Sequence, residues 1–247
     1  MSEEWIIGKN PVFEALKSGR TINKVFVSDQ LQHQAFQKIQ NLAKENGALV
    51  QKVPRKKIDQ LVDGNHQGVA ASVAAYDYSS FDDLFATAET LGEAPSFLVL
   101  DEIADPHNLC SVLRTADAVG AHGVIIPKRR SVGLTATVAK TSAGAIEYIP
   151  VARATNLSRT IDELKERHVW VAGTDAEGTE DYRQLDGEMP IALVIGSEGK
   201  GISRIIKEKC DWTISLPMKG KVTSLNASVA ASLLMYEVYR KRNPLGR

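Results

Sequence analysis

The first 76 residues combine short apolar segments with one amphipathic stretch. The short segments are rich in Val and Ala and predict strands at 24–28, 48–53 and 68–76. The amphipathic stretch, residues 31–47, has apolar positions at helical spacing. It ends in Gly47, as expected of a residue that closes a helix in the left-handed conformation. This pattern predicts a small α/β unit over residues 1–76.

A different pattern begins at Ser96. Short continuous apolar runs alternate with helical patterns, which indicates a parallel sheet buried on both faces. The predicted strands are 96–103, 121–127, 169–174 and 191–196, and the predicted helices are 108–119, 133–142, 155–167 and 224–241. Residues 77–95 are polar and predict a linker with one short helix. We therefore expect two domains, 1–76 and 96–247, joined by this linker.

The last predicted helix is apolar on two sides rather than one. One side carries Leu225, Val229, Ser232 and Tyr236, and another carries Ala227, Ala231, Leu234 and Val238. A helix on the surface of a globular protein needs only one apolar stripe, so a second stripe predicts a second packing partner.

Composition adds little to this picture, but charge is distributed unevenly. The chain has 247 residues, is 43% hydrophobic and has a formal net charge of zero, so no global field attracts nucleic acid. Basic residues cluster at 55–57, 128–130, 219 with 221, and 240–242. Each cluster alone is typical of solvated surface, whereas four of them in a neutral chain also fit a local RNA-binding face.

Cysteine usage and the first residues indicate the compartment. Cys110 and Cys210 are far apart in the sequence and form no disulfide framework, which suits a reducing environment. The opening "MSEEWIIGKN" is acidic and lacks the apolar core of a signal peptide, and no apolar run approaches the roughly 20 residues of a membrane span. We expect a cytoplasmic protein. Its five histidines show no metal-ligand spacing, so we expect no metal.

Two familiar nucleotide-binding signatures are absent. A dinucleotide-binding domain would carry G-x-G-x-x-G after its first strand, but "ADPHNLCSVLR" follows the first strand of the second domain. The later "GSEGKGIS" at 196–203 fits neither that pattern nor the phosphate-binding loop G-x-x-x-x-G-K-[ST].

Three loops remain as candidates for a site, because each follows a predicted strand of the second domain. Open α/β sheets bind ligands at the carboxyl ends of their strands. The loops are 105–108 leading to Arg114, 196–201, and 216–218 continuing through 224–226.

These loops lie in segments that resemble a known family. "NLCSVLRTADAVGAHGVI", "LVIGSEGKGIS" and "ISLPMKGKVTSLNASVAASLLMYE" resemble, in order, the three motifs of the SpoU (TrmH) branch of the SPOUT RNA methyltransferases. "IIGKNPVFEAL" and "NHQGVAASV" resemble the substrate-binding domain of the ribosomal-RNA guanosine 2'-O-methyltransferase members. The resemblance covers essentially the whole chain. Cys110 stands where many members have glycine, and as a small residue it should preserve the turn expected there.

The resemblance implies a fold, a cofactor and an assembly. The fold would be a small N-terminal α/β domain of ribosomal-protein type that binds substrate RNA, followed by a parallel-sheet α/β domain with a C-terminal trefoil knot. The cofactor would be S-adenosyl-L-methionine, with no metal. The protein would be a homodimer through its C-terminal domain, so that one side of the last helix packs on its own sheet and the other on the partner.

The resemblance also implies roles for particular residues. The catalytic set is Asn108, Arg114, Glu198, Ser224 and Asn226, and the cofactor-binding set is Thr174, Gly196, Gly201, Leu216 and Leu225. Each residue has a plainer interpretation. Asn and Ser are good helix N-caps, an arginine on a helix is often solvated, a glutamate between glycines suits a turn, and the leucines would suit a core. In the first domain, Gly8, Lys9, Asn10 and the turn 66–68 are candidates for RNA recognition.

The predicted function is S-adenosylmethionine-dependent methylation of an RNA ribose 2'-hydroxyl, on a guanosine of large-subunit (23S) ribosomal RNA. Transfer-RNA 2'-O-methylation and a resistance-type ribosomal methylation are alternatives within the same chemistry. A non-catalytic RNA-binding protein is the alternative of a different class.

Overall fold

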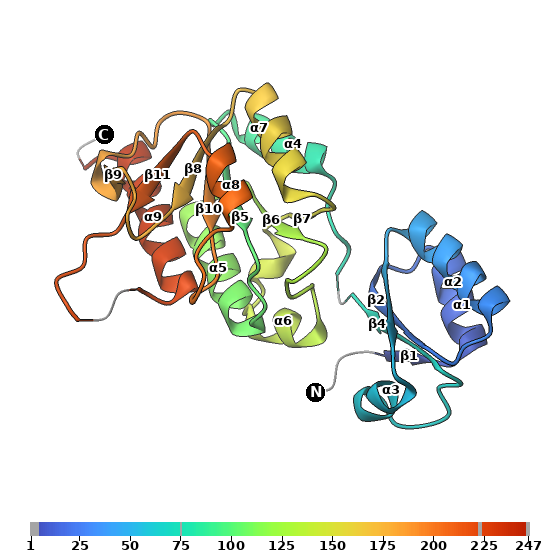
Figure 1. Ribbon diagram of the computed structural model, residues 1–247. Helices are drawn as coiled ribbons and strands as arrows, with labels where there is room; N and C mark the ends of the chain where they lie inside the picture. Colours follow the sequence, from blue (N-terminus) through green and yellow to red (C-terminus); the bar gives the residue numbers. More distant parts are fainter. Residues whose placement is uncertain (1–4, 75, 222–223, 246–247) are drawn as a thin grey trace. The chain divides into compact units, whose positions relative to one another are not determined.

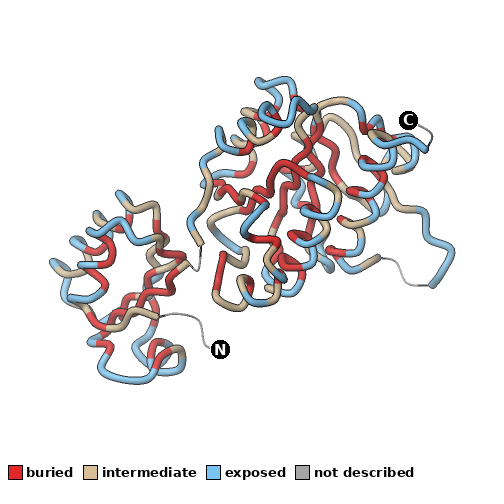
Figure 2. Tube along the Cα trace, turned by 180° about the vertical axis from the view of Figure 1, so that it is seen from behind, coloured by how far each residue is buried: buried red, intermediate tan, exposed pale blue. Residues whose placement is uncertain are grey.

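The computed structural model describes residues 5–74, 76–221 and 224–245, and the chain forms two compact units (Figure 1). Unit 1 comprises Met1–Asp77 together with Gly133–Lys140, and unit 2 comprises Tyr78–Val132 together with Thr141–Arg247. Figure 2 shows that buried positions concentrate in the strands of each unit. Across the described ranges, no helix has the length and apolar character needed to cross a membrane.

Unit 1 is a mixed sheet with helices on both faces. Its strands are β1 (Trp5–Ile7), β2 (Ile22–Ser28), β3 (Leu49–Val53) and β4 (Val69–Val73), in the order β1-β4-β2-β3. Its helices are α1 (Lys9–Lys17), α2 (His33–Asn46) and α3 (Arg55–Leu61). Helices α1 and α2 share one hydrophobic core with the sheet, and α3 covers a smaller core that includes Val53 and Ala70. As predicted, α2 ends at Gly47, whose φ is 75°.

A short segment from the second half of the chain also belongs to unit 1. Residues Gly133–Lys140 lie with it, and the Asn23 side-chain amide donates to the carbonyl of Leu134 at 3.4 Å. Helix α6 (Ala136–Thr141) starts within this segment and is shorter than the helix predicted over 133–142.

Unit 2 is built on a seven-stranded sheet that is parallel throughout, as the apolar runs predicted. The order is β7-β6-β5-β10-β8-β11-β9. The strands are β5 (Ser96–Leu100), β6 (Gly123–Pro127), β7 (Val151–Ala154), β8 (Trp170–Thr174), β9 (Glu180–Asp181), β10 (Ile191–Ile195) and β11 (Trp212–Ser215). Two short 3-10 helices, η1 (Ala145–Glu147) and η2 (Tyr182–Gln184), lie in the connections.

Helices cover both faces of this sheet. They are α4 (Phe81–Leu91), α5 (Pro106–Val119), α7 (Leu157–Glu166), α8 (Arg204–Lys209) and α9 (Ala227–Arg242). Helices α4, α7 and α8 share a core with Phe97, Val99, Ala192 and Val194. The alternate strand residues Leu98 and Leu193 point the other way, toward the face that α5 and α9 cover, and they are buried too.

The segment 77–95 is not the simple linker that its polarity predicted. Its helix α4 packs in the core of unit 2, where Leu84 is fully buried and the Phe85 ring lies 5.0 Å from the ring of Phe97. The apolar positions Phe81, Leu84, Phe85 and Ala88 follow helical spacing, and the surrounding polar residues hide this stripe in the sequence.

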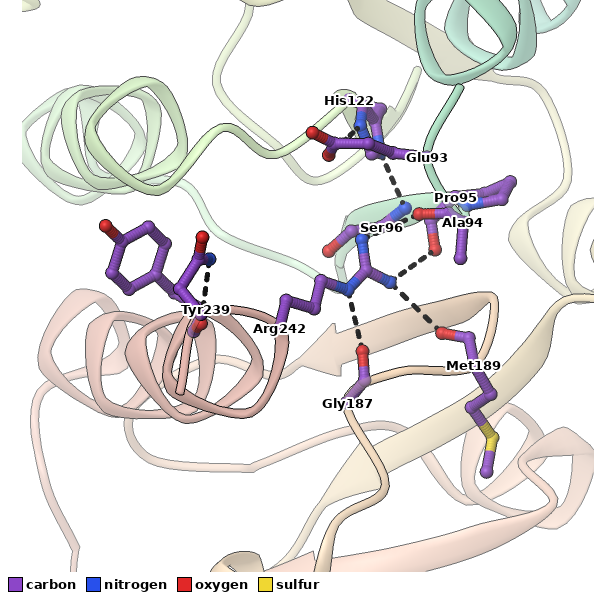
Figure 3. A network of polar contacts seen from close by, with 10 residues as sticks. Glu93, Ala94, Pro95, Ser96, His122, Gly187, Met189, Tyr239 and Arg242 are labelled. Atoms are coloured by element: carbon purple, nitrogen blue, oxygen red, sulfur yellow. Dashed lines mark hydrogen bonds and ion pairs between the residues drawn. The ribbon is translucent and has the colours of Figure 1, made fainter. Parts of the chain in front are cut away.

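The C-terminus of α9 is fixed at the amino-terminal edge of the sheet (Figure 3). The Arg242 guanidinium donates to the main-chain carbonyls of Ala94 (2.6 Å), Pro95 (3.3 Å), Gly187 (2.7 Å) and Met189 (3.1 Å), which lie just before β5 and β10. Arg240 pairs with the buried Glu237 at 2.7 Å. The basic cluster 240–242 is therefore not wholly free to bind RNA, because Arg242 is used within the unit, although the side chain of Arg240 is 63% exposed.

Candidate active site

Helix α5 starts earlier than the sequence predicted, and this places Asn108 inside the helix. Asp105 is the N-cap, its carboxylate accepts the His107 N–H at 2.8 Å, and Pro106 occupies the first turn, where proline needs no hydrogen-bond donor. The interpretation of Asn108 as an N-cap is thus wrong. Its side chain is free for another role, although the residue is only 8% exposed.

That role is a hydrogen-bonded cluster that joins the three candidate loops. Asn108 Nδ2 donates to Glu198 Oε1 at 3.1 Å. Asn226 Nδ2 donates to Asn108 Oδ1 at 3.0 Å and also to Glu198 Oε1. Three residues far apart in the sequence therefore meet as one polar site, which we call the Asn–Glu–Asn cluster.

Asn226 has two functions at once. Its Oδ1 accepts the main-chain N–H groups of Ser228 (2.9 Å) and Val229 (3.3 Å), so it is the N-cap of α9. Its Nδ2 serves the cluster. The cap interpretation of this residue is confirmed, its role in an active site stays a prediction, and capping fixes the direction in which the amide points.

The glycine loop that carries Glu198 is tightly folded. A Cβ on Gly196 would lie 2.0 Å from the carbonyl carbon of Gly201, so only glycine fits there. Gly201 has a φ of +66°, and its N–H donates to the Ser197 carbonyl at 2.8 Å. Gly199, in contrast, has open space around its Cβ position and no positive φ. Two of the three glycines are therefore required by the backbone.

The expected cofactor-binding residues follow neighbouring strands. Thr174 ends β8, Gly196 follows β10 and Leu216 follows β11, and these three strands are adjacent and parallel. Their carboxyl ends meet at one edge of the sheet, as ligand sites in open α/β sheets require. Leu225 is half-buried and directly precedes the N-cap of α9.

One residue of this edge escaped the sequence analysis. Asp101 follows β5, is 6% exposed, and accepts the Ser203 N–H at 2.8 Å, which ties the end of the glycine loop to the end of β5. A carboxylate directly after a continuous apolar run was the available signal.

Two predicted catalytic residues lie outside the cluster. Arg114 is exposed on α5, and in the part of the chain that the structure describes no hydrogen bond or ion pair joins it to Glu198. Ser224 is exposed two residues before Asn226, and within the same described residues it makes no hydrogen bond to the cluster. Glu198 binds the two asparagines instead of holding Arg114.

Cys110 lies within α5 and not in a turn, so the expectation of a turn at this position is wrong. It is 3% exposed, its sulfur lies 2.7 Å from Thr141 Oγ1, and burial raises the pKa of its thiol. Cys210 is similar, since burial raises its pKa to about 12. Among the described residues neither cysteine forms a disulfide, and burial disfavours the reactive thiolate of both.

The loops at this edge have features that suit an organic cofactor. Within the described ranges, no three His, Cys, Asp or Glu residues gather as metal ligands. In the compact glycine loop, glycine is required at 196 and 201, and the main chain there can approach a flat group closely.

Comparisons with known proteins show the family of this chain. The SpoU rRNA Methylase family model matches residues 95–236, and a model described as RNA 2'-O ribose methyltransferase substrate binding matches residues 5–79. A Bacillus subtilis protein named as a TrmH family tRNA/rRNA methyltransferase is 63% identical over 243 residues, which are 98% of this chain and 98% of that protein.

Solved structures are similar over nearly the whole chain. The SpoU methyltransferase AviRb from Streptomyces viridochromogenes, crystallised with its cofactor AdoMet, is 25% identical with a TM-score of 0.62, covering 96% of this chain and 90% of that one. An rRNA methyltransferase from Sinorhizobium meliloti is 26% identical with a TM-score of 0.60, covering 96% and 86% respectively.

The fold is that of an RNA methyltransferase. The chain belongs to the SpoU family, whose TrmH-type members it matches from end to end, and its cofactor is S-adenosylmethionine.

Proposed function

We propose that the protein methylates a ribose 2'-hydroxyl of a guanosine in large-subunit (23S) ribosomal RNA. The Asn–Glu–Asn cluster carries this proposal, since three loops converge on one polar site beside the cofactor loops. A similar protein is named for both tRNA and rRNA, so transfer RNA is the alternative substrate. A pure RNA-binding protein would have no need for this convergence.

The cofactor would lie on the loops after β8, β10 and β11. Thr174, Gly196 and Gly201 would supply close main-chain approach, and Leu216 and Leu225 would supply apolar walls. When bound, S-adenosylmethionine supplies an electrophilic methyl group on a sulfonium. The protein's main contribution is then to align the ribose oxygen with that methyl group, and alignment alone can be worth roughly 7–11 kcal/mol.

Glu198 and the two asparagines would orient the ribose. All the described hydrogen bonds to the Glu198 carboxylate go to Oε1, which leaves Oε2 to accept a hydrogen bond from a ribose hydroxyl. The amides of Asn108 and Asn226 hold the carboxylate in place, so it can act without rearrangement. Ser224 would contribute its hydroxyl from the loop that carries Asn226.

Arg114 would bind the RNA rather than act as a base. A guanidinium stays protonated, so it cannot readily take the 2'-hydroxyl proton. It can bind the neighbouring phosphate with two N–H groups and stabilise negative charge that develops on the oxygen. Its exposed position on α5 suits contact with a large substrate.

Unit 1 would select the RNA, with Lys9, Asn10 and the turn at 66–68 among its contacts. His66 is buried there, its Nδ1 accepts the Gly68 N–H at 3.0 Å and its Nε2 lies 2.7 Å from Asp59. It would therefore shape the turn rather than touch RNA.

We place the protein in the cytoplasm, with its RNA substrate. The trefoil knot stays a prediction.

The protein would act as a homodimer through α9. The inward stripe of this helix is buried in its own unit, whereas Val229, Leu233 and Tyr236 form an outward stripe that is 46%, 42% and 51% exposed. An apolar stripe of this size beside an active site is suited to a second copy of the chain.

Light scattering should give twice 26.9 kDa at micromolar concentration. Tyr236→Asp should give monomers, while Ile205→Asp on exposed α8 should not. A wild-type mass near 26.9 kDa would rule the dimer out.

Transfer of labelled methyl groups to ribosomal RNA tests the chemistry. A 2'-O-methyl ribose cannot attack its own 3'-phosphate, so alkaline hydrolysis should leave the label in alkali-resistant dinucleotides. Label found only in mononucleotides would mean base methylation.

Arg114→Ala should keep cofactor affinity and lose roughly 10²–10³-fold in turnover, and Arg114→Lys should recover little of the lost turnover.

A further inference from the structure

Among the basic clusters of the sequence, Lys128-Arg129-Arg130 has a distinctive position. It directly follows β6, which lies between β5 and β7 in the parallel sheet. The cluster therefore lies at the carboxyl edge, where β5 leads to Asn108. The loops after β10, β8 and β11 occupy the other half of this edge. The loop after β5 thus separates a basic half from a cofactor half.

The basic loop is fastened to the loop that leads to Asn108. Arg130 Nη1 donates to Glu102 Oε1 at 2.8 Å, and the Val132 N–H donates to the Ile103 carbonyl at 3.0 Å. Arg130 and Glu102 both have left-handed backbones, with φ of 57° and 59°. Non-glycine residues seldom adopt this conformation unless their surroundings hold them in it. The position of the basic loop relative to α5 is thus fixed by two strained residues that pair with each other.

Charge on this loop is only partly compensated. In the part of the chain that the structure describes, neither Lys128 nor Arg129 forms an ion pair with a carboxylate. Lys128 lies near Arg153 of β7, and burial and then this like charge lower the pKa of Lys128. Arg130 is 80% exposed and uses one N–H on Glu102, which leaves further donors for another group. Holding like charges together in this way is favourable when an anion binds between them.

We propose that Lys128, Arg129 and Arg130 bind phosphates of the substrate RNA backbone and guide the strand toward the Asn–Glu–Asn cluster. This proposal rests on the proposed RNA methylation and names a surface for it. Planar guanidinium groups and an ammonium are suited to phosphate, and such contacts fix position without reading bases. The surface should therefore increase affinity for RNA and leave the choice of nucleotide to other parts of the protein.

The test compares two double variants that remove the same charge. Lys128→Gln/Arg129→Gln alters the proposed surface and leaves the Arg130–Glu102 pair in place. Lys17→Gln/Lys44→Gln removes two exposed charges from the last turns of α1 and α2, and Lys17 lies at the opposite end of α1 from the proposed RNA contact Lys9. Binding of ribosomal RNA fragments is measured by filter retention across a range of salt concentrations. Turnover is measured with the full-length protein, and cofactor affinity is measured by calorimetry.

The first variant should lose about 1.4–1.8 in the slope of log affinity against log salt, since each phosphate contact contributes about 0.7–0.9. Six to ten phosphate contacts lose about 10³–10⁵ in affinity when salt rises from about 50 to 200 mM, so removing two contacts should reduce this salt-induced loss roughly tenfold and raise KM for RNA at low salt. Its kcat and cofactor affinity should stay within about twofold of wild type, and the control should keep the wild-type slope.

An unchanged slope in the first variant, or an equal loss in both variants, would overturn the surface. A protein that transfers no methyl group to RNA would overturn the proposed function instead. The binding slopes need no turnover, so they still decide this inference in that case.

Discussion

The two edges of the unit 2 sheet are both fixed by polar contacts to α9, but in opposite ways. At the carboxyl edge, Asn226 at the start of α9 meets Asn108 and the exposed Glu198. At the amino-terminal edge, Arg242 at the end of α9 is surrounded by main-chain carbonyls (Figure 3). The side chains of the first network keep hydrogen-bonding capacity for a ligand. In the second network, the N–H groups of Arg242 donate to the backbone of the protein itself.

This difference separates function from stability within one helix. A half-buried arginine whose guanidinium donates to main-chain carbonyls stabilises the fold and has few donors left for a substrate. An exposed carboxylate positioned by two amides contributes less to folding, and under the proposed function it would contribute more to chemistry. Substitutions at the two edges should therefore fail in different assays.

The largest effect is expected from Gly196→Ala at the carboxyl edge. Its Cβ would lie 2.0 Å from the carbonyl carbon of Gly201, so the loop must open and displace both the cofactor site and Glu198. Turnover should fall by more than roughly 10³-fold, with a loss of cofactor affinity seen by calorimetry. The matched change Gly199→Ala, with open space at its Cβ position, should leave both unchanged. Equal effects of the two changes would contradict the tight loop.

Asn226→Asp should separate the two functions of the N-cap. The carboxylate still accepts the N–H groups of Ser228 and Val229, so the Tm should change little. It cannot donate to Glu198, and its charge repels that carboxylate. Turnover should fall by about 10²–10³-fold. Asn226→Ala should show the same kinetic loss and lose about 1 kcal/mol of stability as well. Normal turnover in both would remove Asn226 from the site.

Arg242→Ala should behave in the opposite way. It leaves main-chain carbonyls at the amino-terminal edge without their donor, which should cost about 3 kcal/mol in urea unfolding. Methyl transfer below the unfolding transition should stay near wild type. Arg242→Lys should restore only part of the stability, since one ammonium cannot reach carbonyls on both sides. A variant of full stability and reduced turnover would reverse the comparison.

The smallest effect concerns His122, which lies at the same edge. Its Nδ1 accepts the Ser96 N–H at 3.0 Å, and its Nε2 lies 3.2 Å from Glu93. Burial, more than the nearby Arg242, lowers the pKa of His122 below 6.5. The unfolded chain therefore binds this proton more readily, and stability is lost as pH falls below about 6.5. The Tm should fall by a few degrees in this window, and less in His122→Gln. Parallel pH profiles for the two proteins would show that His122 is not responsible.

Much of the sheet could be predicted, because β5 and β10 are continuous apolar runs that only a doubly covered sheet explains. Strands at or near the two ends of the strand order, β7 and β11, were not predicted. β7 contains an arginine and β11 has one fully buried residue, so neither stands out as apolar. Helices α3 and α8 were not predicted either. They have seven and six residues, which are too few to display a helical period.

The polar residues at the two edges also fall into a group that the sequence predicted and a group that it did not. Asn108, Glu198 and Asn226 could be predicted as site residues because they lie after strands in motifs that resemble the family, and the structure joins them by hydrogen bonds. Arg242 was mistaken for part of a surface cluster, since main-chain carbonyls are present at every residue and leave no trace in the sequence. Asp101 and the early start of α5 depend on the same kind of contact between a side chain and the backbone.

The inclusion of Gly133–Lys140 in unit 1 has a consequence for how this protein can be recombined. The chain passes between the units at 77, at 132 and again at 140, so a single crossover cannot exchange one unit as an intact module. A hybrid that joins a relative's first 77 residues to the rest of this chain would face Leu134 with a foreign residue in place of Asn23. Inheritance of the two units should therefore be coupled, with the surface around β2 and the segment 133–140 changing together.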